Sequence, residues 1–396
     1  MPRWRVTARL RVLGASLLSL VVAASVWLPA VHLLFPGDAV DAGVPSPRAR
    51  QLASASLALW ADPARRRAEI DRMRATNAEW DFMGRTMLVL ALCELALVEP
   101  ARKAEYLSVV DTILDETLRL EREQGMTVFL MPYAKARPYR VEPARSLFVD
   151  GEIALMLGAR RVVEERDDYR PLLAARVATI TERLRASPVM VVESYPNEAW
   201  LFDHAAALAA VRMSDWLERE DHDSLFRAWT ATARRTLIEP SSGLLVSSYQ
   251  VDARPLDGPE GSSIWFALHC LRLVDAGLAR EQYDRAKPLL ARSAFGFGWS
   301  REWPPNARGG VDVDSGIVIP ILEVSPGASG LALIAAASFG DHEFLRRLVA
   351  TQELAAFPVR SNGALRYAAS NQVGDAVALY AASIGPLWSR VSEPRR

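Results

Sequence analysis

The sequence has no excess of charge of either sign. Its 396 residues carry 47 Lys and Arg and 47 Asp and Glu side chains, so the formal net charge at pH 7 is zero. A nucleic-acid-binding protein needs a basic face that neutralises phosphates, and no cluster of lysines occurs along this chain. We therefore expect no nucleic-acid partner.

Cysteine and histidine are scarce too, with two and five copies. Cys93 and Cys270 each lie in an apolar stretch, and neither belongs to a CxxC pair. A structural zinc site needs clustered Cys and His ligands at short spacing, so we expect no metal and interpret both thiols as small buried side chains. A disulfide between them stays open.

The N-terminal segment resembles a membrane anchor. Four arginines, the last of them Arg11, precede an uncharged run over residues 12–37. This run is longer than the about 20 residues that cross a bilayer, and no small-x-small cleavage site closes it. Arginines before the span and Asp38 and Asp41 after it place the N-terminus in the cytoplasm. A cleaved signal peptide is the alternative interpretation.

This interpretation divides the chain into three parts. Residues 1–37 form a cytoplasmic stub and a transmembrane anchor, residues 38–50 form a linker, and residues 51–390 form the folded domain. We expect a single-pass protein of the inner (cytoplasmic) membrane, with the C-terminal domain in the periplasm or outside the cell.

Beyond the linker nearly every segment has helical periodicity, and no alternating strand pattern appears. We expect twelve helices, at residues 47–74, 81–98, 101–124, 145–165, 168–187, 198–219, 222–238, 261–277, 279–294, 314–339, 341–355 and 372–385.

The connections between these helices alternate between short and long. Helices joined by a short turn are antiparallel neighbours. Helices that follow a long loop are small and apolar, such as "HAAALAAVRM", whereas helices that follow a short turn are amphipathic, such as "ARKAEYLSVVDTILDETLRLER". Apolar helices belong inside and amphipathic helices outside. The sequence therefore predicts an all-α fold, an (α/α)6 barrel of six helical hairpins behind one N-terminal transmembrane helix. An α-solenoid would keep a tighter repeat period.

The predicted inner helices begin with polar residues, which places these residues at the mouth of the barrel beside the long loops. The segment "YPNEAWLFDHAAALAAVRMSD" (195–215) is the strongest example. Single carboxylates at helix N-termini are ordinary capping groups. Several of them converging on one mouth, ringed by aromatic loops, predict a ligand site.

Within this site Asp203 is the candidate general acid, because its apolar neighbours Trp200 and Phe202 would raise its pKa. Asp312 or Asp314, in "GGVDVDSG", is the candidate base. Such a pair suits glycoside hydrolysis and equally dehydration or epimerisation. The "DVD" also resembles part of a calcium loop, but no twelve-residue pattern ending in Glu follows.

The candidate substrate-binding residues are aromatic or polar side chains on or beside the long loops: Tyr195, Glu198, Trp200, His204, Tyr249, Trp303 and Arg308. His204 follows Asp203 directly, so the two side chains point about 100° apart on a helix, and a hydrogen-bonded structural role is its alternative. Arginines such as Arg308 favour anionic ligands, which tilts the expectation slightly toward acidic sugars or phosphorylated ligands.

The stretch "ESYPNEAWLFDHAAALAAVRMSDWLEREDHDSLFRAWTATARRTLIEPSSGLLVSSY" resembles the central part of the linalool dehydratase/isomerase family. "MLVLALCELALVEPARKAEYLSVV" before it, and "GGVDVDSG" and "LIAAASFGDHEFL" after it, stand in matching order. The resemblance covers roughly residues 79 to 380. It implies an (α/α)6 barrel, acid–base addition and removal of water at a terpenoid alcohol, no cofactor, and a homo-oligomer.

This chain departs from that family at the active site. The family uses two cysteines that flank this helix start, and the matching positions here are Ser194 and Asp203. The glutamate beside the first cysteine is Tyr195 here. A fold likeness alone does not carry function.

Two function classes remain. The favoured one is a cofactor-independent acid–base enzyme, a hydro-lyase or isomerase or a glycoside hydrolase, acting on a small molecule or an oligosaccharide. The alternative is a non-catalytic envelope binding or scaffold protein. It predicts that the mouth carboxylates pair with arginines, such as Asp81 with Arg85 and Asp312 or Asp314 with Arg308.

Overall fold

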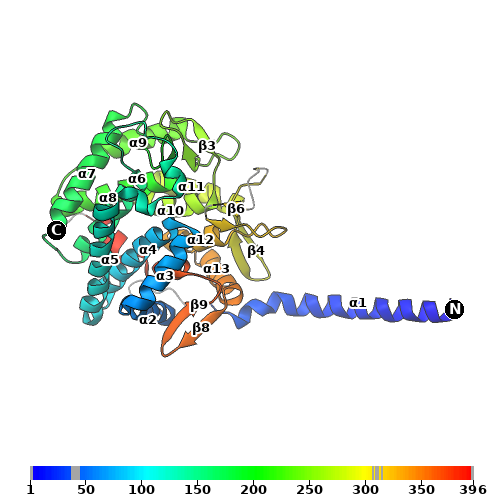
Figure 1. Ribbon diagram of the computed structural model, residues 1–396. Helices are drawn as coiled ribbons and strands as arrows, with labels where there is room; N and C mark the ends of the chain where they lie inside the picture. Colours follow the sequence, from blue (N-terminus) through cyan, green and yellow to red (C-terminus); the bar gives the residue numbers. More distant parts are fainter. Residues whose placement is uncertain (1–2, 37–44, 306, 308–311, 314, 394–396) are drawn as a thin grey trace.

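The computed structural model describes residues 3–36, 45–305, 307, 312–313 and 315–393. Over these residues the chain is mostly helical, with fifteen α-helices and nine short strands (Figure 1). The helical class predicted from the sequence is therefore right, and the expectation of no strands is wrong.

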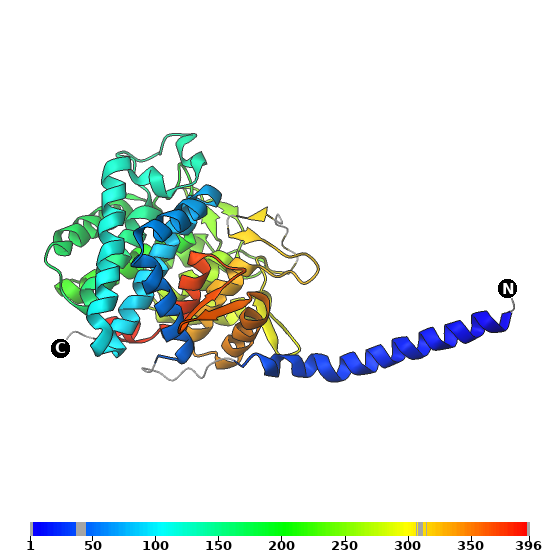
Figure 2. The ribbon, with the colours of Figure 1, turned by 60° about the horizontal axis from the view of Figure 1, so that its bottom comes forward.

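The N-terminal helix α1 (Arg3–Val31) runs into a 3-10 turn, η1 (His32–Leu34). The segment Arg11–Leu34 has 24 residues and a mean hydropathy of 2.1, and it is not buried against the rest of the protein. It is long and apolar enough to cross a membrane, although a signal sequence has the same properties. Figures 1 and 2 show α1 standing away from the body of the protein as a single rod.

Six helices form a closed inner ring: α4 (Ala78–Val98), α6 (Leu147–Val163), α8 (Leu201–Glu218), α10 (Gly261–Leu271), α12 (Pro326–Ser338) and α14 (Gln372–Ser383). Each inner helix contacts the next inner helix along the chain, and the last one, α14, contacts the first one, α4, which closes the ring. These are the segments whose apolar composition predicted an inner position.

The amphipathic helices lie outside this ring: α2 (Pro47–Trp60), α5 (Lys103–Gln124), α7 (Tyr169–Ala186), α9 (Asp223–Thr236), α11 (Ala276–Leu290) and α13 (His342–Ala355). The helices α5, α7, α11 and α13 each pack on the inner helix that precedes them, and α2 packs on α14. The first helix of the domain thus supplies the outer partner of the last inner helix.

The predicted helix over residues 47–74 is two helices, because α3 (Pro63–Thr76) begins anew after α2. The Asp62 side chain accepts the backbone N–H groups of Ala64 and Arg65. Pro63 occupies the first helical position, where a missing N–H costs nothing. Cap and proline together start a second helix.

Three other predicted boundaries are wrong. The helix expected from residue 314 begins at Pro326, where Ser325 caps its first turn. The helix α10 ends at Leu271, and α11 gives way to a strand after Leu290. A further short helix, α15 (Pro386–Ser392), follows α14.

The strands lie in the connections between helices and pair as small antiparallel sheets. The sheets are β1 (Ala199–Trp200) with β2 (Ser248–Tyr249) and β3 (Pro255–Asp257), β4 (Ala291–Ala294) with β5 (Phe297–Ser300), β6 (Asp312–Val313) with β7 (Gly316–Ile317), and β8 (Pro358–Ser361) with β9 (Ala364–Tyr367). Three further 3-10 turns are η2 (Pro100–Arg102), η3 (Met126–Phe129) and η4 (Pro132–Lys135). Apart from η2, which joins the end of α4 to α5, these segments lie in the long connections that lead into the inner helices.

Small residues let the inner helices approach closely. A Cβ atom on Gly151 of α6 would lie 3.0 Å from the Cβ of Ala207 on α8. At the other end of the ring, α15 contacts α4, α6 and α8. There the buried Glu94 carboxylate accepts the backbone N–H groups of Gly385 and Leu387. The ring is therefore covered at the end where α4 finishes.

Candidate active site

A cavity of about 490 Å³ lies where the six inner helices begin. Each of them contributes to its lining through its first turns: Glu79 of α4, Phe148 of α6, Asp203 of α8, Ser262 of α10, Gly327 of α12 and Val373 of α14. The long connections complete the wall. The cavity therefore occupies the mouth that the alternation of loop lengths predicted.

Aromatic rings form much of the wall. Trp80, Trp200 and Phe202 line it, together with Tyr133 and Tyr195. The rings of Tyr133 and Tyr195 stack with centroids 4.6 Å apart. Flat, rigid rings of this kind suit the face of a sugar or an isoprenoid chain.

Asp203 is the central polar group of this lining. It lies in the first turn of α8 and is only 5% exposed. Burial raises the pKa of its carboxyl group well above the usual value, the Ser194 hydroxyl opposes this, and the charges of Glu79 and Glu198 add to it. Within the described part of the chain no Lys, Arg or His forms an ion pair with Asp203. The cavity thus holds a carboxyl group that favours its protonated form.

A second acid, Glu152 of α6, lies fully buried inside the ring. One carboxylate oxygen accepts the Thr86 hydroxyl at 2.5 Å, and the other has no partner among the described residues. Burial raises the pKa of Glu152 well above the usual value, the Thr86 hydrogen bond opposes this, and the charges of Asp203 and Glu79 raise it further. Glu152 is therefore a second buried acid, inside the ring behind Asp203, whose pKa is raised mainly by burial.

Glu79 lines the cavity and is held by Tyr195. The Tyr195 hydroxyl donates to the Glu79 carboxylate and accepts the backbone N–H of Met131 at 2.9 Å. Burial, followed by the charge of Glu79, raises the pKa of Tyr195, so the phenol keeps its proton. Neither Glu79 nor Glu152 was among the catalytic or substrate-binding candidates named from the sequence. The signal that could have found them is their position in the first turns of the inner helices α4 and α6.

Glu198 lies at the edge of the site and orients aromatic residues. Its carboxylate accepts the indole N–H of Trp200 at 2.6 Å and the hydroxyl of Tyr133 at 3.3 Å. The structure thus brings together four of the predicted site residues: Tyr195, Glu198, Trp200 and Asp203.

His204 and Tyr249 are predicted binding residues that lie behind the cavity wall. The His204 Nε2 accepts the backbone N–H of Val192 at 3.1 Å, and Nδ1 lies 2.9 Å from the Trp200 carbonyl and 3.1 Å from the Tyr249 hydroxyl. Nδ1 therefore carries the proton. Burial lowers the pKa of His204 to about 4. The geometry gives His204 a hydrogen-bonded structural position rather than a contact with ligand.

The remaining predicted residues are not brought to the site. Trp303 does not line the cavity. Asp314 and Arg308 lie outside the described residues, and so does the side chain of Asp312, whose backbone belongs to β6. The structure therefore does not place the expected pairing of Asp203 with Asp312 or Asp314.

Other acids in the first turns of inner helices form ion pairs. Asp81 bonds to Arg85 at 2.9 Å and to Arg74 at 3.0 Å. Asp150 bonds to Arg145 and, at 2.6 Å, to Arg176. The pairing that a scaffold protein would show is thus present at these two positions and absent, over the described residues, at Asp203 and Glu152.

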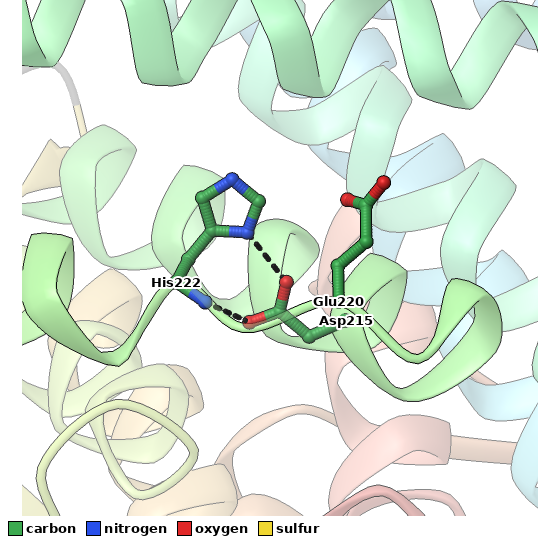
Figure 3. A group of neighbouring side chains, drawn as sticks. All are labelled: Asp215, Glu220 and His222. Carbon is green, nitrogen blue, oxygen red and sulfur yellow. Dashed lines mark hydrogen bonds and ion pairs between the residues drawn. The ribbon is translucent and has the colours of Figure 1, made fainter.

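Another group of polar side chains lies at the far end of α8, where Asp215, Glu220 and His222 come together (Figure 3). The Asp215 carboxylate accepts the His222 backbone N–H at 3.1 Å and the ring N–H of Nδ1 at 2.6 Å. Both oxygens of Asp215 thus bind the turn that follows α8. These hydrogen bonds stabilise the turn between α8 and α9, which accounts for the three side chains lying close together.

The comparisons with known proteins leave the family open. No family model and no curated protein matches the chain. Among solved structures, a selenomethionine derivative of a GH76 alpha-mannanase from Bacteroides thetaiotaomicron matches with a TM-score of 0.46 and 10% identity, over 78% of this chain and 86% of that one. Similarity at this level carries no inference about function. The resemblance to the linalool dehydratase/isomerase family finds no support in these comparisons.

Proposed function

We propose that the protein is a membrane-anchored (α/α)6 barrel enzyme that hydrolyses a C–O bond of an uncharged glycan by acid–base catalysis. The observation that carries this proposal is Asp203, a buried carboxyl group with a raised pKa that faces an aromatic-lined cavity. A buried acid without a cationic partner lowers stability, and perturbed acids in cavities are typical of catalytic sites.

In this mechanism Asp203 donates its proton to the oxygen of the scissile bond as the C–O bond breaks. A water molecule supplies the new C–O bond. Glu79, which lines the same cavity, accepts a proton from that water, and the Tyr195 hydroxyl holds the Glu79 carboxylate in position. Proton exchange with solvent then restores both groups.

The lining also supports an uncharged ligand. Among the described residues it contains aromatic, aliphatic and small side chains, serines, one asparagine and two acids, and no Lys or Arg. Within this described lining, a phosphate or a uronic acid would face Glu79 and Asp203 without a compensating cation. We therefore propose an uncharged ligand; Arg308, on which the slight expectation of an anionic ligand rested, lies outside the described residues.

Turnover measurements on the detergent-solubilised full chain test the proposal. The protein is incubated with neutral oligosaccharides in ¹⁸O-labelled water, and the products are weighed by mass spectrometry. We expect one ¹⁸O atom per cleaved bond. Asp203→Asn should lower kcat by about 10²–10⁴-fold, as loss of a general acid does. Asp284→Asn, a matched change at an exposed acid on α11, should leave kcat unchanged.

Other results would select a different function. Wild-type turnover by Asp203→Asn would refute the acid role. Loss of water from an acyclic terpenoid alcohol, with no cleavage of glycans, would favour a hydro-lyase. Binding of oligosaccharides without turnover, unchanged in Asp203→Asn, would favour the envelope binding or scaffold protein.

A further inference from the structure

Five large apolar side chains are exposed on the β4–β5 hairpin and on the segment that is hydrogen-bonded to it. They are Phe295, Ile317, Ile319, Ile321 and Leu322, and we refer to them as the apolar rim. Ile321 is 97% exposed. Soluble proteins seldom expose neighbouring large apolar side chains unless another surface covers them.

The rim belongs to one structural unit. Phe295 lies at the turn of the β4–β5 hairpin, Ile317 is the last residue of β7, and the other three lie between β7 and α12. The indole N–H of Trp299, in β5, donates to the Leu322 carbonyl at 3.0 Å. The Ser325 backbone N–H donates to the Ser300 carbonyl at 3.0 Å. These bonds hold the loop against the hairpin.

The same hairpin receives the end of the N-terminal helix. The His32 ring lies 6.4 Å from the Phe297 ring, edge to face, and the Phe35 ring lies 6.2 Å from it. At Gly296 a Cβ atom would collide with the His32 ring, so the turn of the hairpin is in direct contact with η1. In Figures 1 and 2 the loops around β4 and β6 project from the body on the side toward which α1 extends.

The rim also adjoins the mouth of the cavity. Ser315 and Gly316 line the cavity, and the next residue, Ile317, is 68% exposed. A single short segment therefore links the cavity wall, the exposed apolar side chains and the hairpin that contacts η1.

We infer that the apolar rim inserts into the surface of the bilayer that α1 spans, so that the mouth of the cavity opens at the membrane. This inference rests on the membrane anchor of the proposed function and is independent of catalysis. The occupant is the bilayer because the chain's own candidate span ends on the hairpin that carries Phe295 and holds the loop with the other rim residues. Apolar side chains at such a surface enter the boundary between headgroups and acyl chains. A ligand carried by the membrane, such as a glycan on a lipid, would then reach the cavity directly.

Depth measurements with a fluorescent label test the inference. The full chain is reconstituted in nanodiscs of phosphatidylcholine and phosphatidylglycerol, with an environment-sensitive dye on Ile321→Cys. Cys93 and Cys270 are buried and should not react. The matched control is Leu172→Cys, at a 40% exposed position on the outer helix α7.

We expect lipids with a spin label high on the acyl chain to quench the dye at position 321 at least threefold more than the dye at 172. Aqueous iodide should show the opposite order. Equal quenching at the two positions would overturn the inference. So would protection of position 321 from both quenchers, with disulfide cross-linking between two copies of Ile321→Cys, because a second copy would then cover the rim.

A result that disproves the membrane anchor can be distinguished from one that disproves only the insertion of the apolar rim. Mass spectrometry of the mature protein and extraction of membranes at alkaline pH report whether α1 is retained and embedded. An embedded α1 with a water-exposed position 321 overturns the rim inference alone. A cleaved α1 overturns both the anchor and the rim inference. The turnover of oligosaccharides is measured separately and decides the catalytic proposal.

Discussion

Replacing Glu94 with Gln should change how the stability of the protein depends on pH. Glu94 of α4 is fully buried at the covered end of the ring. Its carboxylate accepts the backbone N–H of Leu387 at 2.6 Å and that of Gly385 at 3.1 Å. Burial raises the pKa of Glu94 from 4.5 to about 8, and the two N–H groups oppose that rise.

The sign of the change in stability with pH follows from the number of protons bound by the folded and the unfolded chain. Between pH 4.5 and about 8 the folded chain holds a proton on Glu94 that the unfolded chain has released. Stability therefore falls as pH rises through this range. Each pH unit lowers the free energy of unfolding by about 1.4 kcal/mol, so the loss from Glu94 over the whole range is about 5 kcal/mol.

In the Glu94→Gln variant this contribution to the pH dependence of stability is lost, and the substitution instead lowers the free energy of unfolding by the same amount at every pH. Its amide NH₂ group faces one of the two backbone N–H donors, and an unsatisfied buried donor costs about 1–3 kcal/mol. The variant should therefore be less stable than the wild type below about pH 5 and more stable by about 2–4 kcal/mol at pH 8.

Urea unfolding of the full chain in detergent, followed by tryptophan fluorescence at pH 5, 6, 7 and 8, measures this difference. Other buried acids also titrate, and subtraction of the two proteins removes their contributions. Glu105→Gln, at an exposed position of α5, is the matched control and should follow the wild type. A constant difference between Glu94→Gln and the wild type from pH 5 to 8 would refute the reasoning.

Three further predictions concern packing and charge. Gly151→Ala places a Cβ atom 3.0 Å from that of Ala207 and should lower the free energy of unfolding by about 1–3 kcal/mol; an unchanged urea midpoint would contradict this close approach. Asp203→Asn should raise the Tm at pH 8 and leave it nearly unchanged near pH 4, because the raised pKa of Asp203 makes its ionised form costly in the folded state; a lower Tm at pH 8 would contradict it. His222→Gln should not alter the response of the Tm to added Zn²⁺, because Asp215 already binds the His222 N–H groups; a zinc-dependent rise in Tm that this substitution abolishes would show a metal site.

The ring of inner helices could be predicted from the sequence because the composition of the helices and the lengths of the loops are signals spread over the whole chain. Six apolar segments and the alternation of loop lengths suffice to order the inner helices, and the packing of α14 on α4 closes the ring. Helix boundaries depend on single caps. Ser325 and Pro326 mark the start of α12 and Asp62 with Pro63 marks the start of α3, and both signals are readable in the sequence. The strands contain two to four residues, too few to show an alternating pattern.

The site was predictable only in part. Asp203 was identified because its segment is unusual in composition, and it lines the cavity. His204 and Tyr249 were expected beside it, yet both are buried behind the wall. Which face of a helix meets the cavity depends on how packing rotates that helix, and one sequence does not specify that rotation. For the same reason Glu79 and Glu152 were not selected.

A helical-wheel argument nevertheless separates the acids once the ring is known. Residues two apart on a helix point about 200° from each other, so Asp150 and Glu152 face opposite sides of α6. Asp150 bonds to Arg176 of the outer helix α7, and Glu152 lies inside the ring with one oxygen unpaired among the described residues.

The same division occurs on α4, where Asp81 binds Arg74 of α3 and Glu79 lines the cavity. The outward acids are thus neutralised by arginines and contribute to the fold. The inward acids lower stability, and two of them, Glu79 and Asp203, line the cavity and are the base and the acid of the proposed chemistry. Replacing Asp150 should therefore impair folding, whereas replacing Asp203 should impair turnover and leave the fold intact.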